Sequence, residues 1–367
     1  MSKLKNKMLL IDPNMARVFI PWAIRHPRYI FSFRKLVKSY KKSIFLRREI
    51  LSVEGIKVPP FLIISITKQC NLKCAGCYAA ANGTLNNEKI HQLQLEEWRR
   101  IIQEGNELGV FAYVIAGGEP FLFKGLLELC KEFNDRLFII FSNGTAIKEH
   151  HLKLLKKMTN TAVIVSIEGG KEEHDNRRGN GVYEKAIKTL KKLNKIGIIN
   201  GISVTVNALN YKYWIQEEAI DNLIKEGIRI GFFLEYIPTK PGIESYLMLS
   251  DEERAKFRKM ILDYRVKKKI YLVHSPGDEE LMGGCVSAGR GFAHITPGGD
   301  LTPCPVSNLA THNLKSATLK QALASPFFKL IRENEGLLET EGVPCALFAH
   351  QEELLEIVKT VGAYTVN

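Results

Sequence analysis

From residue 61 to residue 237 the sequence alternates apolar runs typical of strands with stretches that have the 3.6-residue period of helices. Such alternation predicts parallel strands, because each helix returns the chain to the start of the next strand. We therefore predict an α/β fold with a partial (β/α)6 TIM-like barrel. The predicted strands are 61–67, 113–117, 137–142, 162–168, 201–207 and 230–237, and the predicted helices are 95–108, 122–133, 147–158, 182–196 and 213–226.

Three cysteines directly follow the first predicted strand. Cys70, Cys74 and Cys77 form a Cys-x3-Cys-x2-Cys pattern, which places three thiolates on one tight loop. Three thiolates can hold three corners of a cubane iron-sulfur cluster and leave its fourth iron open for chemistry. A structural zinc would need paired Cys-x2-Cys knuckles, and no second pair follows Cys77. A zinc site and three unrelated core cysteines are the alternatives, and the position directly after an apolar strand disfavours both.

Length and cysteine usage narrow the class of protein. A chain of 367 residues is long enough for one large domain and a smaller one. Seven cysteines, with three in one short loop, indicate metal ligation in a reducing compartment rather than a disulfide framework. No run approaches the roughly 18 consecutive apolar residues of a membrane span, and residues 1–7 lead into no cleavable apolar segment. We therefore expect a cytoplasmic protein.

The net charge of +13 is concentrated in the first 50 residues. These contain 13 Lys and Arg and two acids, whereas residues 51–367 contain 39 bases and 37 acids. We call these first residues the basic arm. Within it, Pro21 and Pro27 are expected to set apart a short element at 16–24. After this element, apolar and basic residues fall on opposite sides of a predicted helix. The apolar side is predicted to contain Phe33, Leu36, Val37, Tyr40 and Ile44, and the basic side Arg34, Lys35, Lys38, Lys41 and Lys42.

A basic amphipathic helix of this kind has three roles open to it. It can cover the main domain, lie on an anionic membrane surface, or hold a polyanion such as nucleic acid. We favour the covering role first and peripheral membrane contact through residues 28–50, at the inner membrane face, second. Nucleic acid is the least favoured partner, because aromatic-rich basic helices suit lipid interfaces.

Glycine-rich and short polar segments follow the second, third and fourth predicted strands. Loops at the carboxyl ends of parallel barrel strands line the site, so these segments are expected to lie beside the cysteine loop. Glycines permit close backbone approach to a ligand, and serine and asparagine side chains can bind hydroxyl groups, although the same residues also start ordinary turns. The segments are Gly117-Gly118-Glu119-Pro120, Ser142-Asn143 and Ser166-Ile167-Glu168.

The cysteine loop resembles the signature of the radical S-adenosylmethionine (SAM) superfamily. In that family a Gly-Gly-Glu-Pro segment, here residues 117–120, receives the methionine amino group of SAM. Arg178, which stands before Gly179, matches the arginine that pairs with the SAM carboxylate. Many relatives have an aromatic residue where this chain has Gly76, so adenine packing is expected from Tyr78 or from other walls of the site. The other SAM contacts implied for the methionine, ribose and adenine parts are Ser142, Asn143, Ser166, Glu168, Asn207 and Tyr236.

A second group of cysteines lies in the C-terminal part. Cys285, Gly299 and Cys304 resemble the opening of the SPASM and twitch extensions, which bind auxiliary iron-sulfur clusters, and the helix start at 325–328 fits as well. Glycine and proline between the cysteines predict a hairpin that brings the thiolates together. Cys345 would be the third ligand.

The usual place of a fourth auxiliary cysteine is occupied by Phe348. The resemblance therefore implies one auxiliary [4Fe-4S] cluster with three cysteines and either a non-cysteine ligand, for which His350 is the nearest candidate, or an open iron. A cluster-free domain and a Cys3His zinc site are the alternatives. Cys130, on an apolar helix face, is interpreted as a core residue.

The resemblance implies an anaerobic oxidoreductase. A [4Fe-4S] cluster, reduced by a protein such as flavodoxin or ferredoxin, would cleave SAM to methionine and a 5'-deoxyadenosyl radical that abstracts hydrogen from the substrate. We favour a small or lipid-like substrate, with a ribosomal peptide or protein as the alternative. A non-catalytic metal-binding module that docks on nucleic acid or membrane is a third hypothesis. The predicted parts are a basic arm (1–55), a radical SAM core (56–245) and a SPASM/twitch-like auxiliary cluster domain (246–367).

Overall fold

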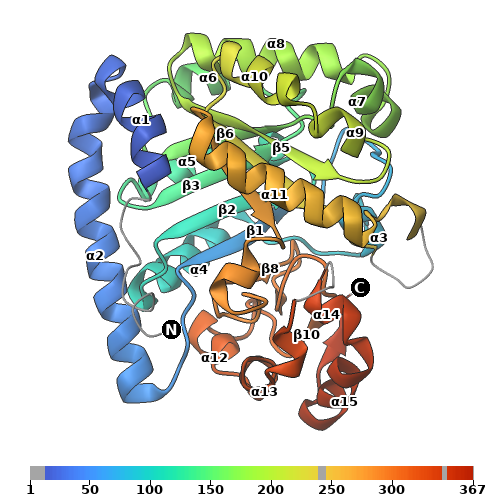
Figure 1. The fold of residues 1–367 in the computed structure, drawn as a ribbon. Helices are drawn as coiled ribbons and strands as arrows, with labels where there is room; N and C mark the ends of the chain where they lie inside the picture. The colour runs from blue at the N-terminus through green and yellow to red at the C-terminus, as the bar shows by residue number, and fades with distance from the viewer. Residues whose placement is uncertain (1–12, 239–244, 341–344, 367) are drawn as a thin grey trace.

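The computed structural model describes residues 13–238, 245–340 and 345–366. Its centre is a nine-stranded sheet in the order β7-β6-β5-β4-β3-β2-β1-β8-β9 (Figure 1). Every neighbouring pair is parallel except β8 and β9. The strands are β1 (Phe61–Thr67), β2 (Ala112–Gly117), β3 (Leu137–Ser142), β4 (Thr161–Ser166), β5 (Ile199–Val206), β6 (Ile230–Glu235), β7 (Tyr271–Ser275), β8 (Phe292–Ile295) and β9 (Leu301–Thr302).

The six predicted strands and their order are confirmed. Helices connect them, but the stretch predicted as one helix over 213–226 forms two, Tyr211–Trp214 and Glu217–Lys225, and the helix Lys171–Arg178 was not predicted. The stretch predicted as one helix over 122–133 begins with a 3-10 turn, and Gly125, at φ +86°, starts the α-helix after it. The elements that flank the sheet are α3 (Tyr78–Ala81), α4 (Leu95–Leu108), η1 (Pro120–Leu122), α5 (Leu126–Glu132), α6 (Glu149–Leu155), α7 (Lys171–Arg178), α8 (Val182–Lys195), α9 (Tyr211–Trp214), α10 (Glu217–Lys225), η2 (Ser245–Leu247) and α11 (Asp251–Lys267).

Two parallel strands, β7 and β8, were not predicted. β7 pairs with β6, and β8 pairs with β1 in the register Phe61 to Phe292 through Ile64 to Ile295. Both strands are short, and both lie within the predicted extension of 246–367. The sheet of the core is therefore continued on both sides by residues from the C-terminal part of the chain.

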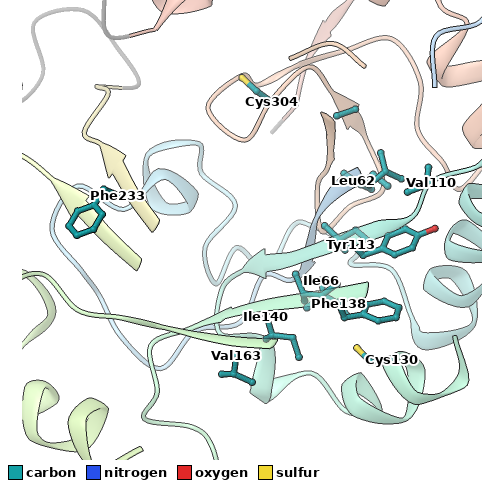
Figure 2. Close-up of a cluster of buried hydrophobic side chains, with 14 of the residues drawn as sticks. Leu62, Ile66, Val110, Tyr113, Cys130, Phe138, Ile140, Val163, Phe233 and Cys304 are labelled. Carbon is teal, nitrogen blue, oxygen red and sulfur yellow. The ribbon is translucent and has the colours of Figure 1, made fainter. Parts of the chain in front are cut away.

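The core lies between the sheet and its helices (Figure 2). Tyr113 stacks on Phe138 with ring centroids 5.4 Å apart, and its hydroxyl donates to the carbonyl of Ile102 at 3.0 Å. Trp98 is fully buried and donates its indole N–H to the carbonyl of Ile66 at 3.1 Å, so its polar atom is satisfied. Cys130 is fully buried in this cluster, which confirms its interpretation as a core residue.

The basic arm forms two helices, α1 (Pro13–Arg25) and α2 (Arg28–Glu54), and its residues 1–12 lie outside the described residues. Their separation confirms the predicted break at Pro27, but the prediction was wrong at Pro21, which lies inside α1 and does not end it. The predicted apolar face of α2 is only partly right, because Phe33 is 50% exposed while the buried positions are Tyr29, Ser39 and Ser43. The small serines allow α2 to approach the domain closely, and Ser39 donates to Asp135 Oδ2 at 3.2 Å. No helix over the described residues combines the length and apolar content needed to cross a membrane.

The C-terminal part packs small elements below β8 and β9 (Figure 1). A helix does begin after Ser325, as predicted, and the Ser325 side chain accepts from the backbone N–H of Phe328 as its N-cap. The elements of this part are η3 (Glu279–Met282), β10 (Leu309–Ala310), α12 (Leu319–Leu323), α13 (Pro326–Glu333), η4 (Gly336–Leu338), α14 (Ala346–Ala349), α15 (Gln351–Val361) and β11 (Tyr364–Thr365).

Candidate functional site

The first cysteine loop joins β1 to α3 at the carboxyl edge of the sheet. Cys70, Cys74 and Cys77 are half-buried, and their thiols are close enough for their charges to interact. Burial raises the pKa of Cys70 to about 11. The backbone N–H of Cys70 donates to Asn86 Oδ1 at 2.9 Å, so the residues after α3 help to hold the start of the loop.

Gly117 and Gly118, at the end of β2, pack against the residues that lead into this loop. The N–H of Gly118 donates to the carbonyl of Thr67 at 2.8 Å. A Cβ at Gly118 would lie 2.1 Å from the carbonyl oxygen of Gln69. The glycine therefore lets two backbones touch directly beside Cys70.

Replacing Gly118 with alanine is expected to displace the backbone of Gln69 and with it the cysteine loop. A misplacement of about 1 Å in a catalytic group can cost about 100-fold in rate. If the loop holds the cluster that the sequence resemblance implies, Gly118→Ala should lower reductive cleavage of SAM by a factor of that order, measured as 5'-deoxyadenosine formed by the reconstituted protein. Gly298→Ala is the matched control, because a Cβ there meets its nearest neighbour at 3.5 Å; equal rates for the two variants would contradict the prediction.

The Glu119 carboxylate, expected at the mouth of the site, faces inward in the structure. Its side chain is 1% exposed and accepts from Ser142 Oγ at 2.8 Å and from the backbone N–H groups of Asn143 and Phe121. Burial raises the pKa of Glu119, and these hydrogen bonds oppose that shift. Pro120 follows as the first residue of η1. The observed effect of the carboxylate is to fasten the end of β3 to the end of β2.

The end of β3 also contacts the cysteine loop itself. Asn143 Nδ2 donates to Asn71 Oδ1 at 2.9 Å, and Asn71 Nδ2 donates to Thr145 Oγ1 at 2.8 Å. Asn71 directly follows Cys70 in the chain. Ser142 and Asn143 are thus brought beside the cysteines, as expected from their place at a strand end.

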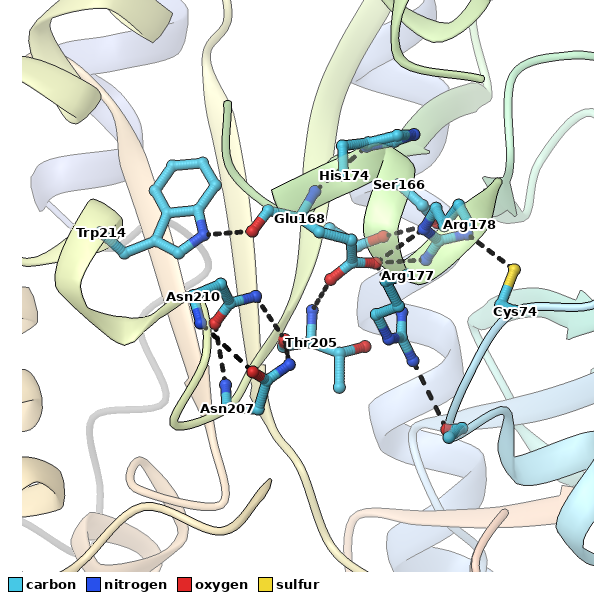
Figure 3. Close-up of polar contacts among 12 residues, drawn as sticks. Cys74, Ser166, Glu168, His174, Arg177, Arg178, Thr205, Asn207, Asn210 and Trp214 are labelled. Carbon is cyan, nitrogen blue, oxygen red and sulfur yellow. Dashed lines mark hydrogen bonds and ion pairs between the residues drawn. The ribbon is translucent and has the colours of Figure 1, made fainter. Parts of the chain in front are cut away.

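A buried ion-pair network joins the fourth strand to the same loop (Figure 3). Glu168 Oε1 accepts from Arg177 at 2.6 Å and from Arg178 Nε at 2.7 Å, and the Glu168 side chain is fully buried. Burial alone would raise the pKa of Glu168, but the charges of Arg177 and Arg178 hold it below its usual value. Glu168 Oε2 accepts from the backbone N–H of Thr205 at 3.0 Å.

Both arginines reach from this network to the cysteine loop. Arg178 Nη1 lies 3.9 Å from Cys74 Sγ, and Arg177 Nη2 donates to the carbonyl of Gly76 at 3.4 Å. The Arg178 guanidinium, expected to meet a ligand carboxylate, is therefore already paired with Glu168. Arg177 was missed from the sequence, although its place beside Arg178 in a segment assigned to ligand contact pointed to it.

The remaining predicted contact residues also end strands at this edge. Ser166 Oγ lies 3.2 Å from Ser203 Oγ. Asn207 Oδ1 accepts from the N–H of Leu209 at 2.9 Å, so this side chain caps its own turn. Tyr236 is buried, and its backbone N–H donates to the carbonyl of Val206 at 2.8 Å.

Tyr78 begins a chain of hydrogen bonds that the sequence did not predict. Its hydroxyl accepts from the N–H of Gly117 at 3.2 Å and lies 3.4 Å from Ser65 Oγ. Ser65 Oγ lies 2.8 Å from His294 Nε2, and His294 Nδ1 lies 2.8 Å from Thr302 Oγ1. The chain runs from the first cysteine loop through β1 and β8 to β9, two residues before Cys304.

His294 is completely buried, and desolvation lowers its pKa to about 3. The unfolded chain binds a proton at this residue near pH 6.5 and the folded chain near pH 3, so stability falls as the pH drops from 6.5 toward 3. Between pH 6.5 and pH 5 the loss is about 2 kcal/mol. Urea unfolding at the two pH values should show a smaller loss for His294→Gln than for the wild type, and identical losses would contradict this prediction.

The second group of cysteines is buried beside the β8–β9 hairpin. Cys285 precedes β8, Cys304 follows β9, and Cys345 caps α14. Burial raises the pKa of Cys285 to about 12 and that of Cys345 to about 11. Burial also raises the pKa of Cys304 well above its usual value, with added repulsion from the other two thiols. A hairpin, β8–β9, separates Cys285 from Cys304, as the glycines and prolines predicted, and the charge of Cys345 acts on both of these thiols.

An acidic side chain, Glu279 in η3, adjoins these thiols and was missed from the sequence. Burial raises its pKa to about 7, opposed by hydrogen bonds with the Cys285 thiol and the Val286 backbone. Its charge acts on Cys345 as well. His350, the candidate suggested by the sequence, is half-buried and lies 3.5 Å from Glu353 Oε1. No pattern of spacing marked Glu279, because it reaches the cysteines only through the fold.

The donor atoms in both groups suit an iron-sulfur cluster. Over the described residues, no three His, Cys, Asp or Glu side chains are arranged to hold a single metal ion. A cubane binds each thiolate at a different iron atom, so its cysteines need not converge on one point. Three thiols on one loop with two guanidiniums beside them fit such a cluster, because thiolate ligands carry negative charge.

Comparison with known proteins agrees with this description. The family model of the radical SAM superfamily matches residues 64–223. The sporulation killing factor maturation protein SkfB of Bacillus subtilis is 29% identical over 181 residues, which are 48% of this chain and 42% of SkfB. The chain thus spans less than half of that relative. The AdoMet-dependent heme synthase of Methanosarcina barkeri is 24% identical over 76% of this chain and 86% of the synthase.

A solved structure has the same fold. The crystal structure of Streptococcus suis SuiB bound to the precursor peptide SuiA superposes with a TM-score of 0.66 at 21% identity. The match covers 77% of this chain and 69% of SuiB. This supports the mostly parallel α/β architecture.

Proposed function

We propose that this chain, in which residues 64–223 match the family model of the radical SAM superfamily, is an enzyme that cleaves SAM reductively and uses the product to abstract hydrogen from an organic substrate. The observation that supports this most is the Cys-x3-Cys-x2-Cys loop at the carboxyl edge of a parallel sheet. Gly118 on one side of the loop and two arginines on the other fix its position.

The radical SAM superfamily uses a [4Fe-4S] cluster and SAM. In our proposal Cys70, Cys74 and Cys77 hold this cluster, and with SAM bound it supplies electron transfer to the sulfonium and a 5'-deoxyadenosyl radical. Arg177 and Arg178 place positive charge beside the thiolates and so stabilise the charged ligands. Because Glu168 fixes both guanidiniums, their positions are set before any ligand binds.

We further propose that SAM binds along the ends of β2 to β6. Glu119 would act by positioning the backbone of Asn143 rather than by direct contact, since its carboxylate is already used. The residues proposed to form the SAM site, by contact or, for Glu119, by positioning its neighbours, are Tyr78, Gly117, Gly118, Glu119, Pro120, Ser142, Asn143, Ser166, Glu168, Arg178, Asn207 and Tyr236.

We propose that an auxiliary cluster is held by Cys285, Cys304 and Cys345. Glu279 is a better candidate than His350 for a non-cysteine ligand, because it contacts the Cys285 thiol. The three parts 1–55, 56–245 and 246–367 remain our proposed division of the chain, with strands of the last part completing the sheet of the second.

Two substrate classes remain, each with its own support. The similarity to a heme synthase, which extends over most of both chains, supports a small or lipid-like substrate. The similarity to SkfB, and to the structure of SuiB with a bound precursor peptide, supports a peptide substrate. A reductant such as flavodoxin or ferredoxin is the expected protein partner in both cases.

The proposal is tested by reconstituting the protein anaerobically with iron and sulfide and adding dithionite and SAM. We expect methionine and 5'-deoxyadenosine, and iron near eight atoms per chain, or about four if the second cysteine group binds no cluster. A protein that contains zinc after anaerobic purification and does not cleave SAM would overturn the proposal. Candidate peptides and porphyrin-like molecules are then compared by their stimulation of 5'-deoxyadenosine formation.

A further inference from the structure

Helix α2 carries a cationic surface that the proposed enzyme activity does not use. Residues 28–48 contain eight Lys and Arg and no acid. Positions three and four apart lie on one face of a helix, and one such series in α2 is exposed to solvent throughout. We call this series the α2 stripe; it consists of Phe31, Arg34, Lys35, Lys38, Lys41, Lys42 and Phe45.

The charges of the stripe are not neutralised within the described residues. None of its five bases forms an ion pair there, and Lys35 bonds only to the neutral side chain of Asn134. Asp135, which contacts α2, pairs with Arg136, and Glu54 at the end of α2 pairs with Lys320. The five positive charges repel one another because they lie on one helix face. Binding of an anionic partner would relieve this repulsion.

Two exposed aromatic rings stand at the ends of the stripe. Phe31 is 77% exposed and Phe45 is 66% exposed. They are 14 residues apart, which is about 21 Å along a helix. Protein surfaces that bind nucleic acid alternate aromatic residues with Lys and Arg. A helix on a lipid surface instead inserts apolar side chains into the bilayer, beside basic residues that contact the head groups. In the α2 stripe the two rings lie at the ends and the Lys and Arg side chains lie between them, which favours binding to lipid.

The contacts of the inner face of α2 show on which side of the domain a lipid surface would lie. Tyr40 packs on Phe111 with ring centroids 5.1 Å apart, Arg47 bonds to the carbonyl of Gly109, and Ser39 bonds to Asp135. These partners precede β2 and β3, so α2 covers the amino edge of the sheet (Figure 1). The cysteine loop lies at the opposite, carboxyl edge, and a surface that binds α2 leaves the candidate active site accessible.

We propose that the α2 stripe docks this protein on the surface of a lipid bilayer that contains anionic head groups. Phe31 and Phe45 enter the interface between head groups and acyl chains, and the five bases contact the lipid charges. This inference does not depend on SAM chemistry, because binding can be measured without turnover. Helix α2 stays packed on the domain when the protein binds, and only its outer face contacts lipid.

The test is cosedimentation of the full chain with vesicles at about 0.1 M salt. We expect binding to vesicles of phosphatidylcholine with phosphatidylglycerol and none to phosphatidylcholine alone. Lys38→Glu with Lys42→Glu should weaken binding at least ~10-fold, because each base near an anionic surface contributes ~5-fold. Phe31→Ser with Phe45→Ser should also weaken it, and the binding that remains should depend more steeply on salt.

Lys185→Glu with Lys188→Glu on α8 is the matched control, since it makes the same change of charge at two positions elsewhere on the surface. It should bind vesicles nearly as the wild type does. Each variant is checked by its thermal unfolding midpoint, so that loss of fold is not read as loss of binding. Absence of vesicle binding by the wild type, equal loss in the α8 control, or binding to nucleic acid alone would overturn the proposal.

Discussion

Cys74→Ala is expected to abolish 5'-deoxyadenosine formation from SAM, while Cys130→Ala leaves it close to the wild-type rate. Cys74 is half-buried in the first cysteine loop, with Arg178 Nη1 3.9 Å from its sulfur. A cubane that keeps only two cysteine ligands loses the corner that fixes it in the loop. Cys130 is packed in the apolar core, where replacement by alanine removes only the sulfur atom.

Cys304→Ala extends this comparison to the second group of cysteines. This variant should lose about four iron atoms per chain and retain cleavage of SAM, because the two groups lie on separate loops. Iron content and 5'-deoxyadenosine are measured on the same anaerobic preparation. A rate for Cys130→Ala as low as that for Cys74→Ala would show that the loss reports misfolding, and unchanged iron in Cys304→Ala would remove the auxiliary cluster.

Glu168→Ala is expected to lower the free energy of unfolding by about 3–5 kcal/mol. The substitution leaves the guanidiniums of Arg177 and Arg178 buried without the carboxylate that they share. It also removes the acceptor of the Thr205 N–H, which ties β5 to the network. The loss should appear as a lower urea midpoint with little change in slope.

Glu96→Ala provides the matched control for this prediction. Glu96 also pairs with an arginine, Arg99, but its side chain is 79% exposed, so water replaces the lost partner. Its stability should remain close to that of the wild type. A loss for Glu168→Ala no larger than for Glu96→Ala would mean that the buried network contributes no more than a surface pair.

The sequence was sufficient to predict the first six strands and the edge at which the candidate site lies. Long apolar runs specify parallel strands, and the carboxyl ends of parallel strands share an edge. Ser142 and Asn143 could therefore be placed beside Cys70 from their positions in the chain. The hairpin between Cys285 and Cys304 followed in the same way from its glycines and prolines.

Contacts made only by the fold could not be predicted from local patterns. β7 and β8 are too short for a clear periodicity, and their strand character comes from pairing with β6 and β1. Neither the ion pair of Arg178 with Glu168 nor the contact of Glu279 with Cys285 could be predicted, because the fold alone brings these residues together. The face of α2 was misjudged at Phe33 because two serines, and not the larger apolar residues, allow the closest approach to the domain.

The pairing of β8 with β1 has a consequence for synthesis of the chain on the ribosome. β1 needs residues 292–295 to satisfy its second edge, and these are made some 230 residues later. Until then one flank of the nascent sheet exposes unpaired backbone groups, which makes this interval the most prone to aggregation. A fragment that stops at residue 245 would retain that exposed flank permanently.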